Sequence, residues 1–233
     1  MDIENIDPEK YFKVALASSV VLFGFEQNQL LIYIHQQQIQ PQKTLYILPS
    51  VYVLPDKNNE QAIRKLIRDH LQIDQIYLEQ LKAFAHVYRN PLGRVVNVAF
   101  YALIKLDENI KIRTKKLNGH WIPYDEIPDL AYDHNEIIDY AKERLKRRFK
   151  RRPVGFSLLP QEFTLTELQT LYEAALGKEM DKRNFRKKIF KSELIVETGN
   201  QTDPEQTRKT AKLYKFDQDK YQKMTLKGYD FLF

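Results

Sequence analysis

The sequence lacks the features that would place a protein in an oxidising compartment or in a membrane. It contains no cysteine, which excludes disulfides and thiolate metal sites. It has no apolar run of about 18 residues, so we expect no membrane-spanning helix. Residues 1–13 are polar and acidic, unlike the start of a secretory signal peptide. These absences predict a cytoplasmic protein.

Apolar residues are plentiful, and charge is unevenly distributed. Hydrophobic residues make up 43% and aromatic residues 12% of the 233-residue chain, enough for true hydrophobic cores. Residues 141–233 contain 22 Lys and Arg against 13 Asp and Glu, a net charge of +9, whereas the remainder has 15 against 18, or −3. A basic half is typical of nucleic-acid binders, because neutralised phosphates release counterions. A solubilising surface is the alternative interpretation.

The N-terminal part, residues 1–130, has the pattern of a mixed sheet with helices. One helical pattern lies among four apolar, strand-like runs: the helix at 59–72, the strands at 12–23, 30–36, 81–89 and 94–105. The first two runs surround a polar turn and predict a hairpin. A Gln-rich loop is expected over 36–42, and the composition of residues 90–93 predicts a turn between the last two strands. Strands without regular alternation with helices favour an α+β fold. We expect the segment 118–131, with its single tryptophan, to be a connector that packs on the sheet.

The C-terminal part, residues 131–233, has the pattern of a winged helix-turn-helix. A helix over 134–149 leads into it. Thr164 and Glu167 form the spacing of a capping box, and the helix they start should end at Gly177. Asp181 is expected to cap a second, basic helix, and two short strands around a polar loop at 198–210 follow. Two helices and a hairpin in this order match the winged-helix plan.

The basic helix carries the residues expected to contact DNA. Phe185 and Ile189 are four residues apart and should face the core, which leaves the cationic side chains on the opposite face. Arginine can pair with guanine, asparagine with adenine, and lysine can neutralise phosphate. An ordinary solvated basic face is the alternative. The candidate DNA-binding residues are Lys182, Arg183, Asn184, Arg186, Lys187, Arg208 and Lys209, with Lys212 as a further hairpin cation.

The run from Leu48 to Ile73 resembles a Nudix box, whose working pattern is G-x5-E-x7-R-E-U-x-E-E-x-G-U with U a bulky aliphatic residue. Aligned on Pro55 and Ala62, the chain departs at nearly every chemical position. Non-matching residues occupy the positions of the glycines, the acids and the arginine: Val51, Lys57, Lys65, Leu66, His70 and Gln72. Asp69 alone remains of the carboxylates that would hold magnesium. The resemblance therefore predicts a Nudix-like domain without catalytic residues, metal or cofactor.

The resemblance extends to the Nudix-related transcriptional regulators of the NrtR family. It rests on Arg89-Asn90-Pro91-Leu92-Gly93-Arg94 in the N-terminal part and on Leu159-Pro160, Phe163-Thr164-Leu165 and Arg183-Asn184-Phe185-Arg186 in the C-terminal part. Within this family, the residues of the motifs most resemble those of the arabinose-responsive AraR branch from gut bacteria. This resemblance implies a homodimeric regulator, expected to be a repressor of a sugar catabolic operon, that binds double-stranded operator DNA and is released by a small effector. Family members elsewhere bind ADP-ribose-like effectors, but the lost magnesium ligands favour an uncharged pentose such as L-arabinose.

Polar residues within apolar strands, or near the box, are the candidates for binding the effector. A sugar needs several hydroxyl partners and an apolar platform in a concave site. The candidates are Lys13, Ser18, Tyr33, Ser50, Tyr52, Arg89, Asn97 and Tyr101; each could instead be a satisfied core or surface residue. Three alternative functions stay open at this point. They are a Nudix hydrolase, an ADP-ribose-responsive regulator, and a scaffold whose basic helix binds acidic proteins.

Overall fold

The computed structural model describes residues 13–40, 43–203, 210–226 and 231. Its chain divides into two compact units, one made of Met1–Phe23, Ile32–Leu103 and Asp107–Ala141, the other of Gly24–Leu31, Ile104–Leu106 and Lys142–Phe233. One division falls inside helix α4 (His134–Arg151), between Ala141 and Lys142. In the described part of the chain, no helix combines the length and the apolar character needed to cross a membrane.

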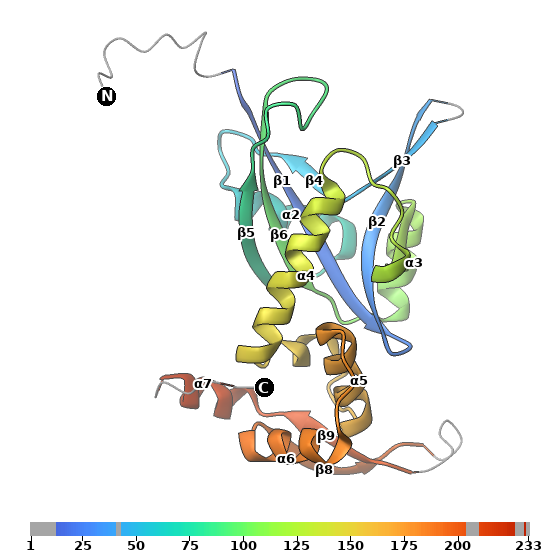
Figure 1. Ribbon diagram of the computed structural model, residues 1–233, viewed down its shortest axis with the longest axis vertical. Helices are drawn as coiled ribbons and strands as arrows, with labels where there is room; N and C mark the ends of the chain where they lie inside the picture. The colour runs from blue at the N-terminus through green and yellow to red at the C-terminus, as the bar shows by residue number, and fades with distance from the viewer. Residues whose placement is uncertain (1–12, 41–42, 204–209, 227–230, 232–233) are drawn as a thin grey trace. The chain divides into compact units, whose positions relative to one another are not determined.

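The first unit is built on a mixed seven-stranded sheet (Figure 1). Its strands are β1 (Ala15–Glu26), β2 (Gln29–Gln40), β3 (Lys43–Ile47), β4 (Ser50–Tyr52), β5 (Tyr77–Phe84), β6 (Val95–Leu103) and β7 (Gly119–Pro123). The main order is β3-β2-β1-β6-β5, with β4 paired to β1 and β7 paired to β2. Strands β1 and β6 are parallel, so the expected mixed α+β sheet is confirmed.

The centre of the sheet follows from the apolar run in β1. Val20, Val21, Leu22 and Phe23 are all at most 2% exposed, because β1 has a strand on each side and is covered on both faces. Gln27 and Asn28 both have a positive φ, of 49° and 63°, so a tight two-residue turn joins β1 to β2. The predicted hairpin is thus confirmed.

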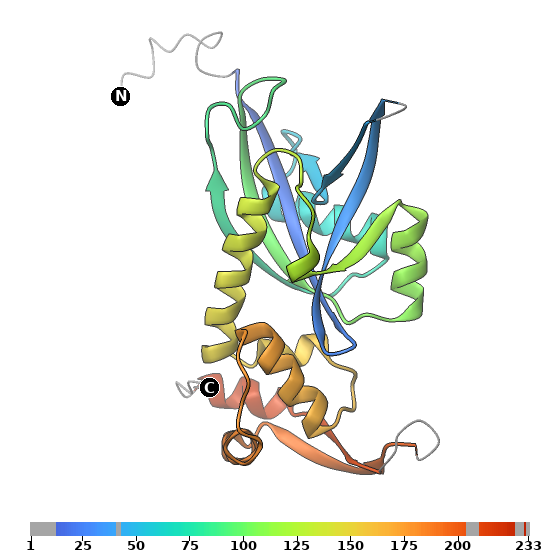
Figure 2. The same ribbon diagram turned by 45° about the vertical axis from the view of Figure 1, so that its right-hand side comes forward.

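Helices cover both faces of this sheet. Helix α2 (Asn59–Leu71) and the first half of α4 (His134–Arg151) lie on opposite faces in both views (Figures 1 and 2). The capping box of α2 pairs Asn58 with Gln61. Helix α3 (Glu108–Lys116) follows β6, with Asp107 as its N-cap.

Several sequence-based expectations for this unit were wrong. The segment 118–131 is not merely a connector, since β7 joins the sheet beside β2. The Gln-rich stretch forms the end of β2 rather than a loop, and the third predicted strand, 81–89, begins earlier, at Tyr77. Polar composition misled in both cases, because the exposed parts of a strand accept polar side chains. Helices α3 and α7 (Gln218–Leu226) were not predicted from the sequence.

The second unit contains the winged helix. Its elements are the 3-10 turn Val154–Leu158, α5 (Leu165–Leu176), α6 (Lys182–Ser192), β8 (Ile195–Gln201), β9 (Lys212–Phe216) and α7. Strands β8 and β9 pair antiparallel, and Phe163 bridges to Tyr214. Aromatic rings fill the core: Tyr172 meets Phe149 edge-on at 5.1 Å between centroids and Phe185 at 5.8 Å. The expected winged-helix plan is confirmed.

Candidate functional site

Helix α6 begins and is oriented by local hydrogen bonds. The Asp181 carboxylate accepts from the Asn184 amide at 2.8 Å, as expected of an N-cap. Phe185 is 2% and Ile189 0% exposed, so these two side chains anchor the helix in the core. Because they occupy one side of the helix, the remaining faces point outward.

The outward faces of α6 are strongly basic. Lys182, Arg183 and Lys187 are exposed, and Arg186 is half-buried. None of these four cations forms an ion pair with any residue that the structure describes. Asn184 is exposed on the first turn. Unpaired cations together with an amide on one exposed helix are suited to phosphate oxygens and base edges in a major groove.

The turn before α6 is held by one carboxylate. Helix α5 starts with the predicted capping box of Thr164 and Glu167 and ends at Gly177, which has a φ of +67°. Glu173 accepts from the backbone amide of Met180 and from the side chain of Gln169, both at 2.9 Å. These bonds fix the angle at which the chain enters α6.

The wing is only partly described. Arg208 and Lys209, two of the predicted DNA-binding residues, lie outside the described residues. Lys212, on β9, forms an ion pair of 2.9 Å with Glu197 of β8, and this partner raises the pKa of the lysine. Within the part of the chain that the structure describes, Lys212 is therefore compensated by a carboxylate, unlike Lys182, Arg183, Arg186 and Lys187 of α6.

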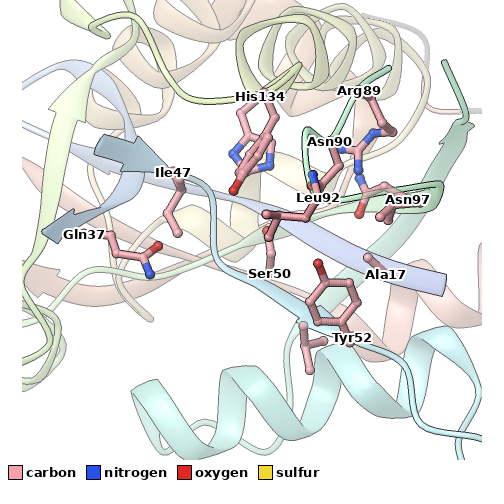
Figure 3. Close-up of a pocket in the computed structure, with 13 residues that line it drawn as sticks. Ala17, Gln37, Ile47, Ser50, Tyr52, Arg89, Asn90, Leu92, Asn97 and His134 are labelled. Carbon is pink, nitrogen blue, oxygen red and sulfur yellow. The ribbon is translucent and has the colours of Figure 1, made fainter. Parts of the chain in front are cut away.

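The first unit contains a pocket of about 380 Å³ (Figure 3), within the range of small-molecule sites. Its lining residues are Ala17, Gln37, Ile47, Ser50, Val51, Tyr52, Arg89, Asn90, Leu92, Val95, Asn97, Tyr132 and His134. Figure 3 shows the Tyr52 hydroxyl directed into the space enclosed by these side chains. The lining combines aromatic rings, amides and hydroxyls.

Strand register builds the floor of this pocket. Ala17 of β1 pairs with Tyr52 of β4 on one side and with Asn97 of β6 on the other, so the three residues form one row on one face of the sheet. The small side chain in the middle leaves space between two larger ones. Asn97 is 2% exposed and donates to the Ser19 hydroxyl at 2.8 Å.

Two ionisable residues complete the wall. The guanidinium of Arg89 donates from Nε to Asp133 at 2.8 Å and also binds that carboxylate through Nη2. His134 accepts from the Leu48 amide through Nδ1 at 3.0 Å, and burial lowers its pKa to about 4. His134 is therefore neutral at pH 7, and the positive charge of Arg89 is matched by a carboxylate.

The structure brings together half of the predicted effector residues. Ser50, Tyr52, Arg89 and Asn97 line the pocket. The other four lie elsewhere: Lys13 is exposed before β1, Ser18 accepts from Asn59 at 2.8 Å, Tyr33 packs beside Trp121, and Tyr101 donates to Glu79 at 3.0 Å.

Several lining residues were missed by the sequence analysis. Gln37 was expected in a loop and His134 at the start of a helix, and no element was predicted for Tyr132. Asn90 was read as part of a turn. No local pattern distinguishes these residues, because the fold brings them to the pocket from three separate segments.

Helix α2 and its C-cap carry the later positions aligned with the Nudix box. Asp69 binds Lys65 on the preceding turn, which lowers the pKa of that carboxyl. Gln72, aligned with the late glycine of the box, has a φ of 56°, a backbone conformation that favours glycine. Among the described residues, no group of three or more His, Asp and Glu side chains is placed to hold a metal ion.

Comparison with known proteins identifies the family. The model of the NrtR DNA-binding winged helix domain matches residues 155–216. The ADPR responsive transcriptional repressor NtrR of Acinetobacter baylyi is 30% identical over 218 residues, which is 92% of this chain and 83% of that protein. The chain belongs to the NrtR family.

Solved NrtR structures extend this result to three dimensions. NrtR of Shewanella oneidensis, crystallised with a 27mer DNA, is 28% identical with a TM-score of 0.75, covering 86% of this chain and 93% of that one. The NUDIX domain of the same protein, crystallised with ADP ribose, is 25% identical with a TM-score of 0.50, covering 61% of this chain and 95% of that one. As an NrtR-family member, this chain combines a Nudix-like domain with a DNA-binding winged helix.

Proposed function

We propose that this NrtR-family protein is a transcriptional repressor whose α6 reads operator DNA and whose Nudix-like domain binds a small effector that releases the DNA. The observation that carries the proposal is the set of four cations on α6 (Lys182, Arg183, Arg186 and Lys187) that form no ion pair with a described residue, presented by a capped helix within a winged-helix fold. Family membership supports the same function, since relatives of similar length are a repressor and a protein crystallised on DNA.

ADP-ribose, rather than a pentose, is the effector we propose. The Acinetobacter repressor is named as ADPR responsive, and the Shewanella NUDIX domain was crystallised with ADP ribose. No relative reported above supports the arabinose prediction. The pocket offers tyrosine rings, amides and one guanidinium, and these groups suit a nucleoside joined to phosphate. Its place on the Nudix-like sheet, lined by four predicted effector residues, further supports this assignment.

DNA binding is tested first, without assuming an operator sequence. A duplex selected from a random library and its shuffled version serve as probes in fluorescence anisotropy at several salt concentrations. We expect tight binding to the selected duplex, and a weaker, less salt-dependent binding for the double variant Arg183→Ala/Arg186→Ala. Each lost phosphate contact should reduce the log–log salt slope by about 0.9.

A matched control separates recognition from net charge. Lys115→Ala/Lys116→Ala removes the same two positive charges from exposed positions on α3 and should leave operator affinity unchanged. Equal losses in both double variants would show that charge alone is responsible and would refute α6 as the recognition helix. The effector is tested by adding ADP-ribose, adenosine or L-arabinose to the complex; release by arabinose alone would restore the pentose prediction.

A further inference from the structure

The ion pair between Arg89 and Asp133 joins the pocket to the start of helix α4. The two residues are 44 positions apart in the sequence. Their side chains are only 5% and 15% exposed, and both carboxylate oxygens accept from the guanidinium. A paired charge in such a buried place is strongly destabilised when it loses its partner. Each residue therefore stabilises the other, and Arg89 can leave Asp133 only when another anion takes the place of that carboxylate.

The segment around Asp133 is part of the pocket wall. Tyr132 and His134, its neighbours in sequence, both line the pocket. Tyr132 has a φ of 62°, in the left-handed region that is costly for a non-glycine residue. The surrounding contacts, chiefly the ion pair and the bond from Leu48 to His134, hold this strained backbone in place.

We propose that Arg89 is the phosphate-binding residue of the pocket, and that an anionic effector displaces Asp133 from the guanidinium of Arg89. Among the described lining residues, Arg89 alone carries a full positive charge at neutral pH. The planar guanidinium binds carboxylate and phosphate with the same two-pronged geometry, so the two anions compete for one site. The proposal rests on the proposed function, because it assigns how that effector is recognised and sensed.

Partner exchange has a consequence for the helix that follows. Loss of the Arg89 contact leaves Asp133 without its cation and removes a bond that maintains the left-handed Tyr132. Helix α4 is continuous from His134 to Arg151, and its residues belong to both compact units. A change at its first turn therefore acts on a helix whose residues are shared by the two units. Thermodynamic linkage requires that DNA and effector then weaken each other's binding equally.

The test measures binding of ADP-ribose and of adenosine, which lacks phosphate, by titration calorimetry. Asp133→Asn removes the competing anion and should tighten ADP-ribose binding by about tenfold while leaving adenosine unchanged. Arg89→Gln should weaken ADP-ribose by at least about tenfold with little effect on adenosine, and Arg89→Lys should lie between. Glu136→Gln is the matched control. It removes an exposed acid of α4 whose ion pair is a long one, 3.5 Å from the Lys82 Nζ.

The outcomes separate the exchange from the proposed function. Asp133→Asn that binds ADP-ribose no better than wild type, or worse, overturns the exchange, since the carboxylate would then only position Arg89. Equal losses of ADP-ribose and adenosine in Arg89→Gln also overturn it. If Arg89→Gln fails to fold, Arg89→Lys and Asp133→Asn decide the question. A wild-type protein that binds neither ligand refutes the effector assignment itself. DNA binding by the same preparation tests the repressor function separately.

Discussion

Lowering the pH should destabilise the Nudix-like unit through His134. This side chain is 4% exposed, and burial lowers its pKa from 6.5 to about 4, whereas unfolding restores the ordinary value. Between pH 6.5 and about pH 4, His134 therefore binds a proton in the unfolded chain but not in the folded chain. The stability contribution is fully present above pH 7, declines as pH falls through 6.5, and is fully lost near pH 4.

The magnitude follows from the two pKa values. At pH 5 the unfolded form of His134 is almost fully protonated and the folded form about one tenth protonated, which corresponds to about 2 kcal/mol of lost stability. His35 adds a change of the same sign, because burial and the neighbouring His70 lower its pKa to about 4. The wild-type protein thus loses more stability with falling pH than His134 alone explains, and a variant is needed to isolate the contribution of His134.

The assay is urea denaturation at pH 7.5 and pH 5, followed by the fluorescence of Trp121, the single tryptophan. His134→Asn keeps a hydrogen-bond acceptor for the Leu48 amide but cannot be protonated. We expect wild type to lose about 2 kcal/mol more than His134→Asn between these pH values. His120→Asn, at an exposed histidine, is the control and should follow wild type. Parallel profiles for wild type and His134→Asn would refute the reasoning.

Three further predictions concern other parts of the chain. Gln72→Gly should stabilise the protein by about 0.5–1 kcal/mol, because the φ of 56° favours glycine; a lowered melting temperature would contradict this. Phe185→Ala should cost about 3–5 kcal/mol and abolish duplex binding, since this ring is buried against Tyr172; a variant with unchanged melting temperature would show that the ring does not anchor α6. Incubation of the protein with magnesium and ADP-ribose should release no AMP; turnover that disappears in Asp69→Asn would show that the box is active.

Elements built from contacts between near neighbours in the chain were predictable. The Asp181 cap, the box of Thr164 and Glu167, and the buried pair Phe185 and Ile189 all depend on residues three or four positions apart. Helix α6 and its basic face followed directly. Strand ends with polar residues were less predictable, because the polar residues of β2 and β5 need neighbouring strands to define them. Strand β5 was therefore placed several residues late.

By itself, the sequence determined that the C-terminal half is basic and that its helices are capped where they are. Those properties belong to single residues or to short spacings. Only the tertiary structure decided which residues share the pocket. The β4–β1–β6 register places Tyr52, Ala17 and Asn97 in one row, and the fold brings Arg89 to Asp133. No local pattern records such partners, because backbone pairing and burial over long separations select them.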